Sequence, residues 1–222
     1  MTDTQTFEAD GRAIPYVDEG NGPAVVLLPA EGLSVSYLDT LATVLVEEDF
    51  RVLRVGTRRP ADSAATLDDL AHDVVDVMDA AGVADAWIGG HAFGGAVARA
   101  VSLSHPDHVN GVLLLGVATA DDPSAALSEF PADMHDADGG VVQAAARTAA
   151  PAEAWSALAP AVPVLVIQGA EDAVAPAAGG EALQASAPDR VSVVAVEGGG
   201  YAFPYTHVGA TSWAIEDYLD WD

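Results

Sequence analysis

The chain has 222 residues and no cysteine, and its 34 Asp and Glu residues outnumber eight basic residues, all of them arginine, giving a formal net charge of −26. Without cysteine it can form no disulfide, thiolate nucleophile or cysteine-ligated metal site. This charge makes nucleic acid and anionic membranes unsuitable partners. Half of the residues are hydrophobic, and the length suits a single α/β domain over residues 1–222.

The acidic residues are spread along the chain and do not form one acidic tail. Such a surface repels itself at low ionic strength, whereas at about 1 M salt the screening length falls to roughly 3 Å. We therefore expect a protein from a salt-adapted organism.

The apolar runs are too short to cross a bilayer, and the N-terminus lacks the basic and apolar regions of a signal peptide. We expect a cytoplasmic location.

The N-terminal half predicts alternating strands and helices. Two short strands around Asp10-Gly11 indicate a hairpin with a D-G turn. The run "AVVLLP" after Pro23 is typical of a buried strand, residues 36–49 have a helical pattern, and "FRVLRV" predicts the next strand. Residues 66–82 predict a helix with Thr66 as its N-cap and Gly82 as its C-cap.

The C-terminal half continues the alternation. Strands are predicted near residues 86–91, 111–118, 162–169 and 190–197, and helices near residues 93–104, 177–187 and 211–219. This order predicts an α/β fold with a mostly parallel, doubly wound sheet of about eight strands and an antiparallel hairpin at the N-terminus.

The stretch "IGGHAFGGAVARA" at residues 88–100 is typical of a strand, a sharp turn and a helix. In the G-x-S-x-G nucleophile elbow, small residues flank a serine on a strained turn, so that its hydroxyl projects above a sheet. Here Gly90 and Gly94 are in place, and Ala92 stands where that serine would be.

Four segments in this order resemble the α/β-hydrolase fold family, from about Gly11 to the C-terminus. They are "VVLLPAEG", "GGHAFGGAVA", "VLVIQGAEDAVAP" and "VAVEGGGYAF". The resemblance implies an oxyanion loop at Ala30 and Glu31, a nucleophile position at Ala92, an acid position at Asp172 and a histidine position at Tyr201.

The resemblance also implies two backbone N–H groups that receive an oxyanion, one from Phe93 and one from Glu31. A methyl group at Ala92 cannot attack a carbonyl. A phenol at Tyr201, with an ordinary pKa near 10, is a poor base at neutral pH. Ordinary serine esterase chemistry is therefore not expected.

The remaining side chains of this region each have two interpretations. Tyr201 either donates a hydrogen bond to Asp172 or a ligand, or fills the space of the missing imidazole. Asp172 either keeps a functional role or caps its own loop. Glu31 is either a general base in a dry pocket or a solvated loop carboxylate.

The histidines are expected to be structural or exposed. His91 is interpreted as a buried neighbour of the turn, with catalysis as the alternative. His207 is interpreted as a surface or helix-start residue, with a contact to Asp172 as the alternative. We expect the other four to face solvent: His72, His105, His108 and His135.

Residues 119–155 are predicted to form a short cap inserted in the domain. Phe130, Met134 and Trp155 either shield a small pocket or pack onto the domain. No metal-binding or phosphate-binding spacing is found, so we expect no metal and no cofactor.

Two function classes follow. The first is a degenerate member that binds a small apolar or carbonyl-containing ligand, or a protein, without hydrolysis. The second is an enzyme: an esterase-like hydrolase whose serine has been replaced by Ala92, or a cofactor-free lyase or isomerase that uses Tyr201 and Asp172. A filled pocket with Phe93, Tyr201 and Phe203 would favour a protein partner.

Overall fold

The computed structural model describes residues 3–61, 65–119 and 126–219. Within these residues, eight strands form one sheet in the order β1-β2-β4-β3-β5-β6-β7-β8. The strands are β1 (Gln5–Ala9), β2 (Arg12–Gly20), β3 (Ala24–Leu28), β4 (Arg51–Val55), β5 (Ala86–Ala92), β6 (Val109–Val117), β7 (Val164–Gly169) and β8 (Val191–Val196). From β4 to β8 all neighbours are parallel, which confirms the predicted fold class.

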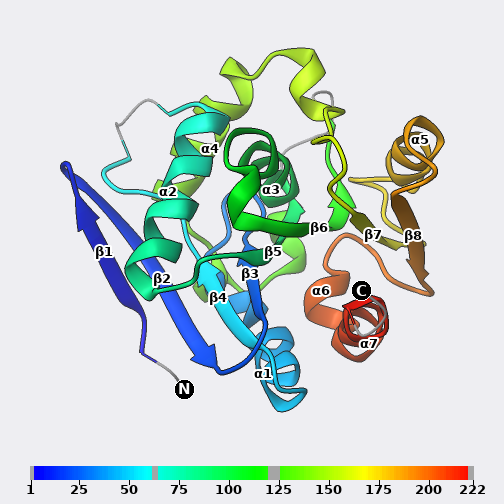
Figure 1. Ribbon diagram of the computed structural model, residues 1–222, viewed down its shortest axis with the longest axis horizontal. Coiled ribbons are helices and arrows are strands. Elements are labelled where there is room, and N and C mark those ends of the chain that lie inside the picture. Colours follow the sequence, from blue (N-terminus) through cyan, green and yellow to red (C-terminus); the bar gives the residue numbers. More distant parts are fainter. Residues whose placement is uncertain (1–2, 62–64, 120–125, 220–222) are drawn as a thin grey trace.

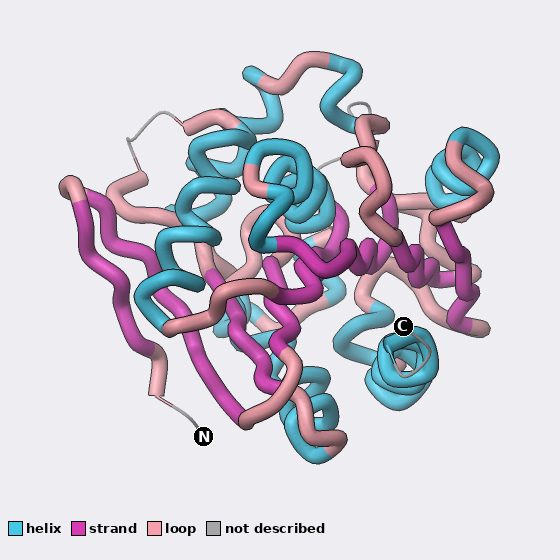
Figure 2. The backbone as a smooth tube through the Cα atoms, viewed as in Figure 1, coloured by secondary structure: helices cyan, strands magenta, loops and turns pink. Residues whose placement is uncertain are grey.

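Helices cover both faces of this sheet. In Figures 1 and 2, α2 and α3 lie on one face and α1 and α7 on the other. The described α-helices are α1 (Asp39–Glu47), α2 (Leu67–Ala81), α3 (Phe93–Ser104), α4 (Ala137–Ala149), α5 (Ala178–Ser186), α6 (Phe203–Thr206) and α7 (Val208–Leu219). The strands between the helical layers are buried, as expected for runs of Val and Leu in a parallel sheet.

Local signals explain several element boundaries. Asp10 and Gly11 both have positive φ, as the predicted D-G hairpin turn between β1 and β2 requires. Thr66 accepts the N–H of Asp69 in a capping box at the start of α2, and Gly82 ends α2 in the left-handed conformation, as predicted. The last helix begins at Val208, three residues before the predicted start.

The segment between β6 and β7 is more helical than its sequence indicates. It contains α4 and the short 3-10 turns η3 (Leu127–Glu129), η4 (Ala132–Met134) and η5 (Ala152–Trp155). Asp136 caps α4 by accepting the N–H of Gly139 at 2.9 Å, so a helix starts in an acidic, glycine-containing stretch. Residues 120–125 of the predicted cap lie outside the described residues, and a lid role for residues 119–155 remains a prediction.

None of the helices in the described ranges is long and apolar enough to cross a membrane.

Candidate functional site

The turn from β5 to α3 has the strained geometry of a nucleophile elbow. Ala92 has φ +49° and ψ −106°, which an L-residue rarely adopts. The flanking glycines allow the turn to pack closely: a Cβ on Gly94 would lie 2.5 Å from the Leu28 carbonyl oxygen, and one on Gly90 would lie 2.1 Å from the Gly94 carbonyl carbon. The backbone therefore holds residue 92 as it would hold a nucleophile, with a methyl group in that place.

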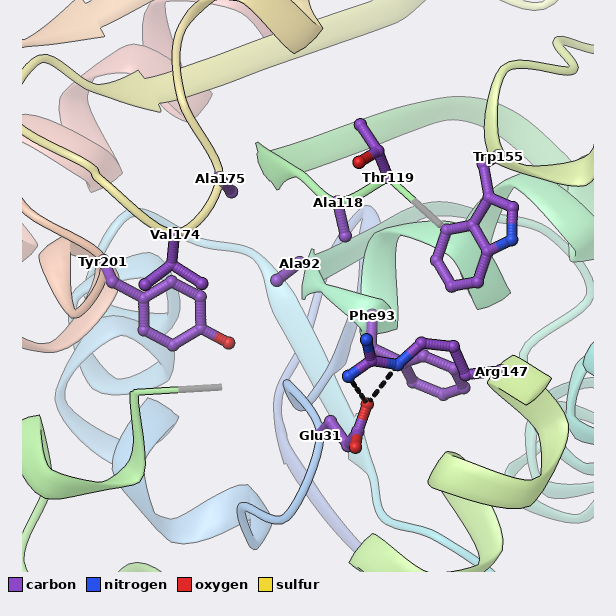
Figure 3. A pocket seen from close by; sticks show the side chains of 10 residues that line it. All are labelled: Glu31, Ala92, Phe93, Ala118, Thr119, Arg147, Trp155, Val174, Ala175 and Tyr201. Atoms are coloured by element: carbon purple, nitrogen blue, oxygen red, sulfur yellow. Dashed lines mark hydrogen bonds and ion pairs between the residues drawn. The ribbon is translucent and has the colours of Figure 1, made fainter. Parts of the chain in front are cut away.

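The Ala92 methyl faces a pocket of about 310 Å³, counting the part that is open to solvent (Figure 3). Its lining is mostly apolar and comes from the elbow, the oxyanion loop, the cap and the loops after β6, β7 and β8. The lining residues are Glu31, Ala92, Phe93, Ala118, Thr119, Arg147, Trp155, Val174, Ala175 and Tyr201. A second cavity of similar size borders the same Phe93 and includes Thr57, Asp73 and Gln143.

Tyr201 is 3% exposed, and its hydroxyl points into the pocket (Figure 3). Its ring packs against His91, with the ring centroids 4.6 Å apart, and meets Phe130 edge to face. Burial is the largest cause that raises the pKa of Tyr201 well above its ordinary value, and nearby Asp172 adds to this shift. Tyr201 is therefore a neutral phenol that can donate a hydrogen bond, and among the described residues its hydroxyl has no hydrogen-bond partner.

Asp172 lies after β7 and is buried. Its Oδ1 accepts the N–H groups of Val174 and Ala175, both at 2.8 Å. Its carboxylate therefore caps its own loop, which is one of the two interpretations drawn from the sequence. Asp172 is not among the residues that line the pocket, although it lies near enough to Tyr201 to raise the pKa of that phenol.

Glu31 forms an ion pair with Arg147 at the pocket wall (Figure 3). Arg147 Nε and Nη2 lie 2.8 and 2.7 Å from the same oxygen, Glu31 Oε2. Both side chains are largely buried, so Glu31 is not the solvated loop carboxylate that its sequence position suggests. Arg147 was not predicted as a site residue, although it is the single basic residue between positions 119 and 155.

The oxyanion loop is bound to the cap and to η1 (Val35–Leu38). The Gly32 N–H donates to Gln143 Oε1 at 2.8 Å, and the Asp136 N–H donates to the Gly32 carbonyl at 2.8 Å. The Ala30 N–H donates to the Tyr37 hydroxyl at 3.0 Å, and Ala30 does not line the pocket. Of the two loop residues proposed from the sequence, Glu31 is the one that faces the pocket.

Phe93 begins α3, so its N–H is at the N1 position, which has no partner within a helix. The first turn of α3 contains no acidic residue, and no side chain caps it. The positive end of the helix dipole therefore faces the Ala92 region without a negative side chain from its own first turn.

His91 is fully buried next to Ala92. Its Nδ1 lies 3.1 Å from the Tyr37 hydroxyl, and burial lowers the pKa of His91 to about 3. A neutral, enclosed imidazole with a tyrosine partner supports the structural interpretation.

The other histidines lie away from the pocket lining. His207 contacts Thr206 Oγ1 through Nδ1 at 2.9 Å, between α6 and α7. His72 and His135 are exposed as expected, whereas His105 and His108 are half-buried because they pack at the end of α3. Among the described residues, no group of three His, Asp or Glu side chains could hold a metal ion.

The three apolar side chains of the cap have different positions. Trp155 lines the pocket, and its carbonyl accepts a hydrogen bond from the buried Arg99 of α3 at 2.6 Å. Phe130 is buried against Tyr37 and Tyr201, behind the pocket wall. Met134 is partly buried against the core. Trp155 therefore shields the pocket, whereas Phe130 and Met134 pack onto the domain.

The sequence model of the alpha/beta hydrolase fold family matches residues 23–152, which is more than half of the chain. The chain belongs to this family.

The curated relatives that match include two candidate carbamate hydrolases named RutD. The RutD of Caulobacter sp. (strain K31) is 35% identical over 119 residues, which cover 49% of this chain and 44% of that protein. The RutD of Variovorax paradoxus (strain S110) is 32% identical over 101 residues, which cover 43% of this chain and 38% of that protein. The chain spans less than half the length of these curated relatives.

Solved structures with the same fold cover almost the whole chain. A thermophilic esterase from Thermogutta terrifontis has a TM-score of 0.81 at 20% identity, covering 99% of this chain and 98% of that one. The enol-lactonase from Burkholderia xenovorans LB400 has a TM-score of 0.78 at 22% identity, covering 97% of this chain and 100% of that one. At these identities the similarity establishes the fold.

Proposed function

We propose that this family member binds a small carbonyl-containing molecule at the elbow and does not hydrolyse it. The observation that carries the proposal is Ala92, which has the backbone conformation of a nucleophile and a methyl side chain. Tyr201, at the histidine position, is a neutral hydrogen-bond donor and not a base. A carbonyl oxygen above Ala92 would meet the Phe93 N–H and the Tyr201 hydroxyl, while the Ala92 methyl cannot form an acyl intermediate.

The shape of the site favours a small ligand over a protein partner. Phe203 is fully buried beneath His91 and does not fill the pocket, and Phe93 and Tyr201 form walls around an open space.

Hydrolysis is the second candidate function, and the RutD relatives favour it because they are named as candidate carbamate hydrolases. A water nucleophile would need a base. Neither Glu31 nor Tyr201 is suited to be that base, because Glu31 is held in an ion pair with Arg147 and Tyr201 is protonated. A lyase or isomerase that uses Tyr201 with Asp172 is less supported, because Asp172 caps its own loop.

The acidic composition supports a salt-adapted protein, and the net charge of −26 disfavours nucleic-acid and anionic-membrane partners. Salt adaptation, the exclusion of these partners and the cytoplasmic location expected from the sequence are all proposals.

Hydrolysis of a short nitrophenyl ester in molar KCl tests the function. The given chain is compared with the double variant Ala92→Ser, Tyr201→His. Removing either side chain from a serine hydrolase lowers turnover by roughly a millionfold. We therefore expect the given chain to show only background hydrolysis and the double variant to gain measurable turnover.

Turnover by the given chain would overturn the proposal. The single variants Glu31→Gln and Tyr201→Phe would then identify the group that activates water. The double variant's unfolding curve, followed by circular dichroism, checks that its activity refers to a folded protein.

A further inference from the structure

The Glu31–Arg147 pair stands between the pocket and a more open depression on the surface of the cap. Both residues line the inner pocket with Ala92 and Tyr201, and both also line the outer depression with Thr148. The pair is thus a boundary that a molecule entering from this side must pass.

Among the described residues that line the pocket, Arg147 is the one with a cationic side chain. One of its partners at rest is a carboxylate, since Nε and Nη2 both approach Glu31 Oε2. Guanidinium groups recognise planar carboxylates well. The ion pair with Glu31 therefore indicates that the Arg147 guanidinium is placed to bind a carboxylate.

The rest of the pocket adds hydrogen-bond donors and apolar surface. The Tyr201 hydroxyl, on a side chain that is almost fully buried, points into the pocket without a hydrogen-bond partner among the described residues. The N-terminus of α3 points the same way from Ala92 and Phe93. Ala118, Val174 and Trp155 offer only carbon surface or, for Trp155, an indole ring.

We infer that the ligand is a small monocarboxylate with a compact apolar body, whose carboxylate takes the place of Glu31 on Arg147. The displaced Glu31 carboxylate turns toward the outer depression that it also lines, so that the guanidinium balances the ligand's one negative charge. One oxygen of the ligand lies within the reach of the Tyr201 hydroxyl. The apolar body packs on Trp155 and Val174. This inference rests on the proposed function, because it names the chemical class of the molecule bound at the elbow.

Calorimetric titration with benzoate and benzamide tests it, at a salt concentration at which circular dichroism shows the chain folded. The two probes share shape and differ in charge. We expect benzoate to bind more tightly than benzamide, and at least about tenfold more tightly once Glu31→Gln has removed the competing carboxylate, since hydrogen bonds to charged groups are worth about 1.5–3 kcal/mol and every 1.4 kcal/mol is tenfold.

Variants at the pair separate recognition from packing. Glu31→Gln keeps the shape and removes the competing carboxylate, so benzoate binding should become about threefold tighter or more, while a merely structural ion pair would give weaker binding. In this Glu31→Gln background, Arg147→Gln should weaken benzoate binding about tenfold and leave benzamide binding within about twofold. Arg51→Gln, which breaks a half-buried pair with Asp18 remote from the pocket, is the matched control and should change neither.

Tyr201→Phe should weaken both probes by roughly fivefold, because both carry a carbonyl-type oxygen. Benzamide binding that equals or exceeds benzoate binding would overturn this inference and leave the proposed function standing. If neither probe binds the folded chain, both the inference and the proposed ligand pocket are wrong.

Discussion

The Tyr37 hydroxyl joins the oxyanion loop to the elbow: it accepts the Ala30 N–H at 3.0 Å and lies 3.1 Å from His91 Nδ1. All three groups are buried. Because the hydroxyl accepts from Ala30, its own proton is available to the imidazole, which then carries its hydrogen on Nε2. One side chain therefore satisfies polar groups of β5 and of the loop after β3.

Replacing Tyr37 by Phe should destabilise the protein by about 1–3 kcal/mol, because the buried Ala30 N–H and His91 Nδ1 lose their partner. Urea unfolding in molar KCl measures the change. Tyr16→Phe is the control, since the Tyr16 hydroxyl bonds Gln5 at the surface, and it should cost less than about 0.5 kcal/mol. Equal effects of the two variants would show that the buried bond adds no stability.

The buried His91 predicts a loss of stability in mild acid. Its pKa is about 3 in the folded protein because of burial and about 6.5 when unfolded. Between these values the unfolded chain binds one more proton at this residue, so the stability it contributes is complete above pH 6.5 and is lost as the pH falls. At pH 5 the loss from this residue is roughly 2 kcal/mol.

Unfolding curves between pH 7 and 5 measure this dependence. His91→Gln should reduce the difference in bound protons between the unfolded and folded chain by about one. If His91→Gln does not fold, NMR of the original chain gives the answer, because the His91 ring signals should not titrate between pH 8 and 5. A midpoint near 6.5 would contradict the assignment.

Ala92→Gly should stabilise the protein by about 1 kcal/mol. Glycine adopts positive φ without steric cost, and strained positions of this kind cost about 1–3 kcal/mol, partly offset by the greater freedom of glycine in the unfolded chain. Ala96→Gly, one turn further in α3, is the control and should destabilise by about 1 kcal/mol. Equal losses in the two variants would mean that residue 92 stores no strain.

Added salt should stabilise the fold, because a net charge of −26 repels itself over about 10 Å at 0.1 M salt and over only about 3 Å at 1 M. We expect the unfolding temperature to rise by roughly 5–10 °C between 0.1 and 1 M KCl, which corresponds to a few kcal/mol. Thermal unfolding followed by circular dichroism measures it. An unchanged temperature would remove the basis for salt adaptation.

The sheet could be predicted well because each parallel strand is a short apolar run between turn residues. The runs at Val25–Leu28 and Leu113–Leu115 are examples, and the glycines of the elbow mark its turn. The antiparallel pairing of β2 with β4 could not be predicted, since the pattern of β2 fits several neighbours. Helix α4 was missed because its first turn contains Gly139 and Gly140, which are weak helix formers.

Only part of the candidate site could be predicted from the sequence. Ala92, Phe93 and Tyr201 follow from motifs, and the structure brings them to one pocket. Arg147 lies 116 positions from its partner Glu31 and belongs to no motif, so only the folded chain reveals the pair. The same holds for the bond between Tyr37 and His91, whose partners are 54 positions apart.

Phe93 has two roles that chemistry can separate. The residue lines both the elbow pocket and the second cavity beside Thr57 and Gln143. Its N–H belongs to the main chain and survives any substitution except proline. We expect a shorter residue at this position to enlarge the space beside Ala92 while the main-chain N–H stays in place, so that a single substitution changes the size of the molecule that the pocket accepts.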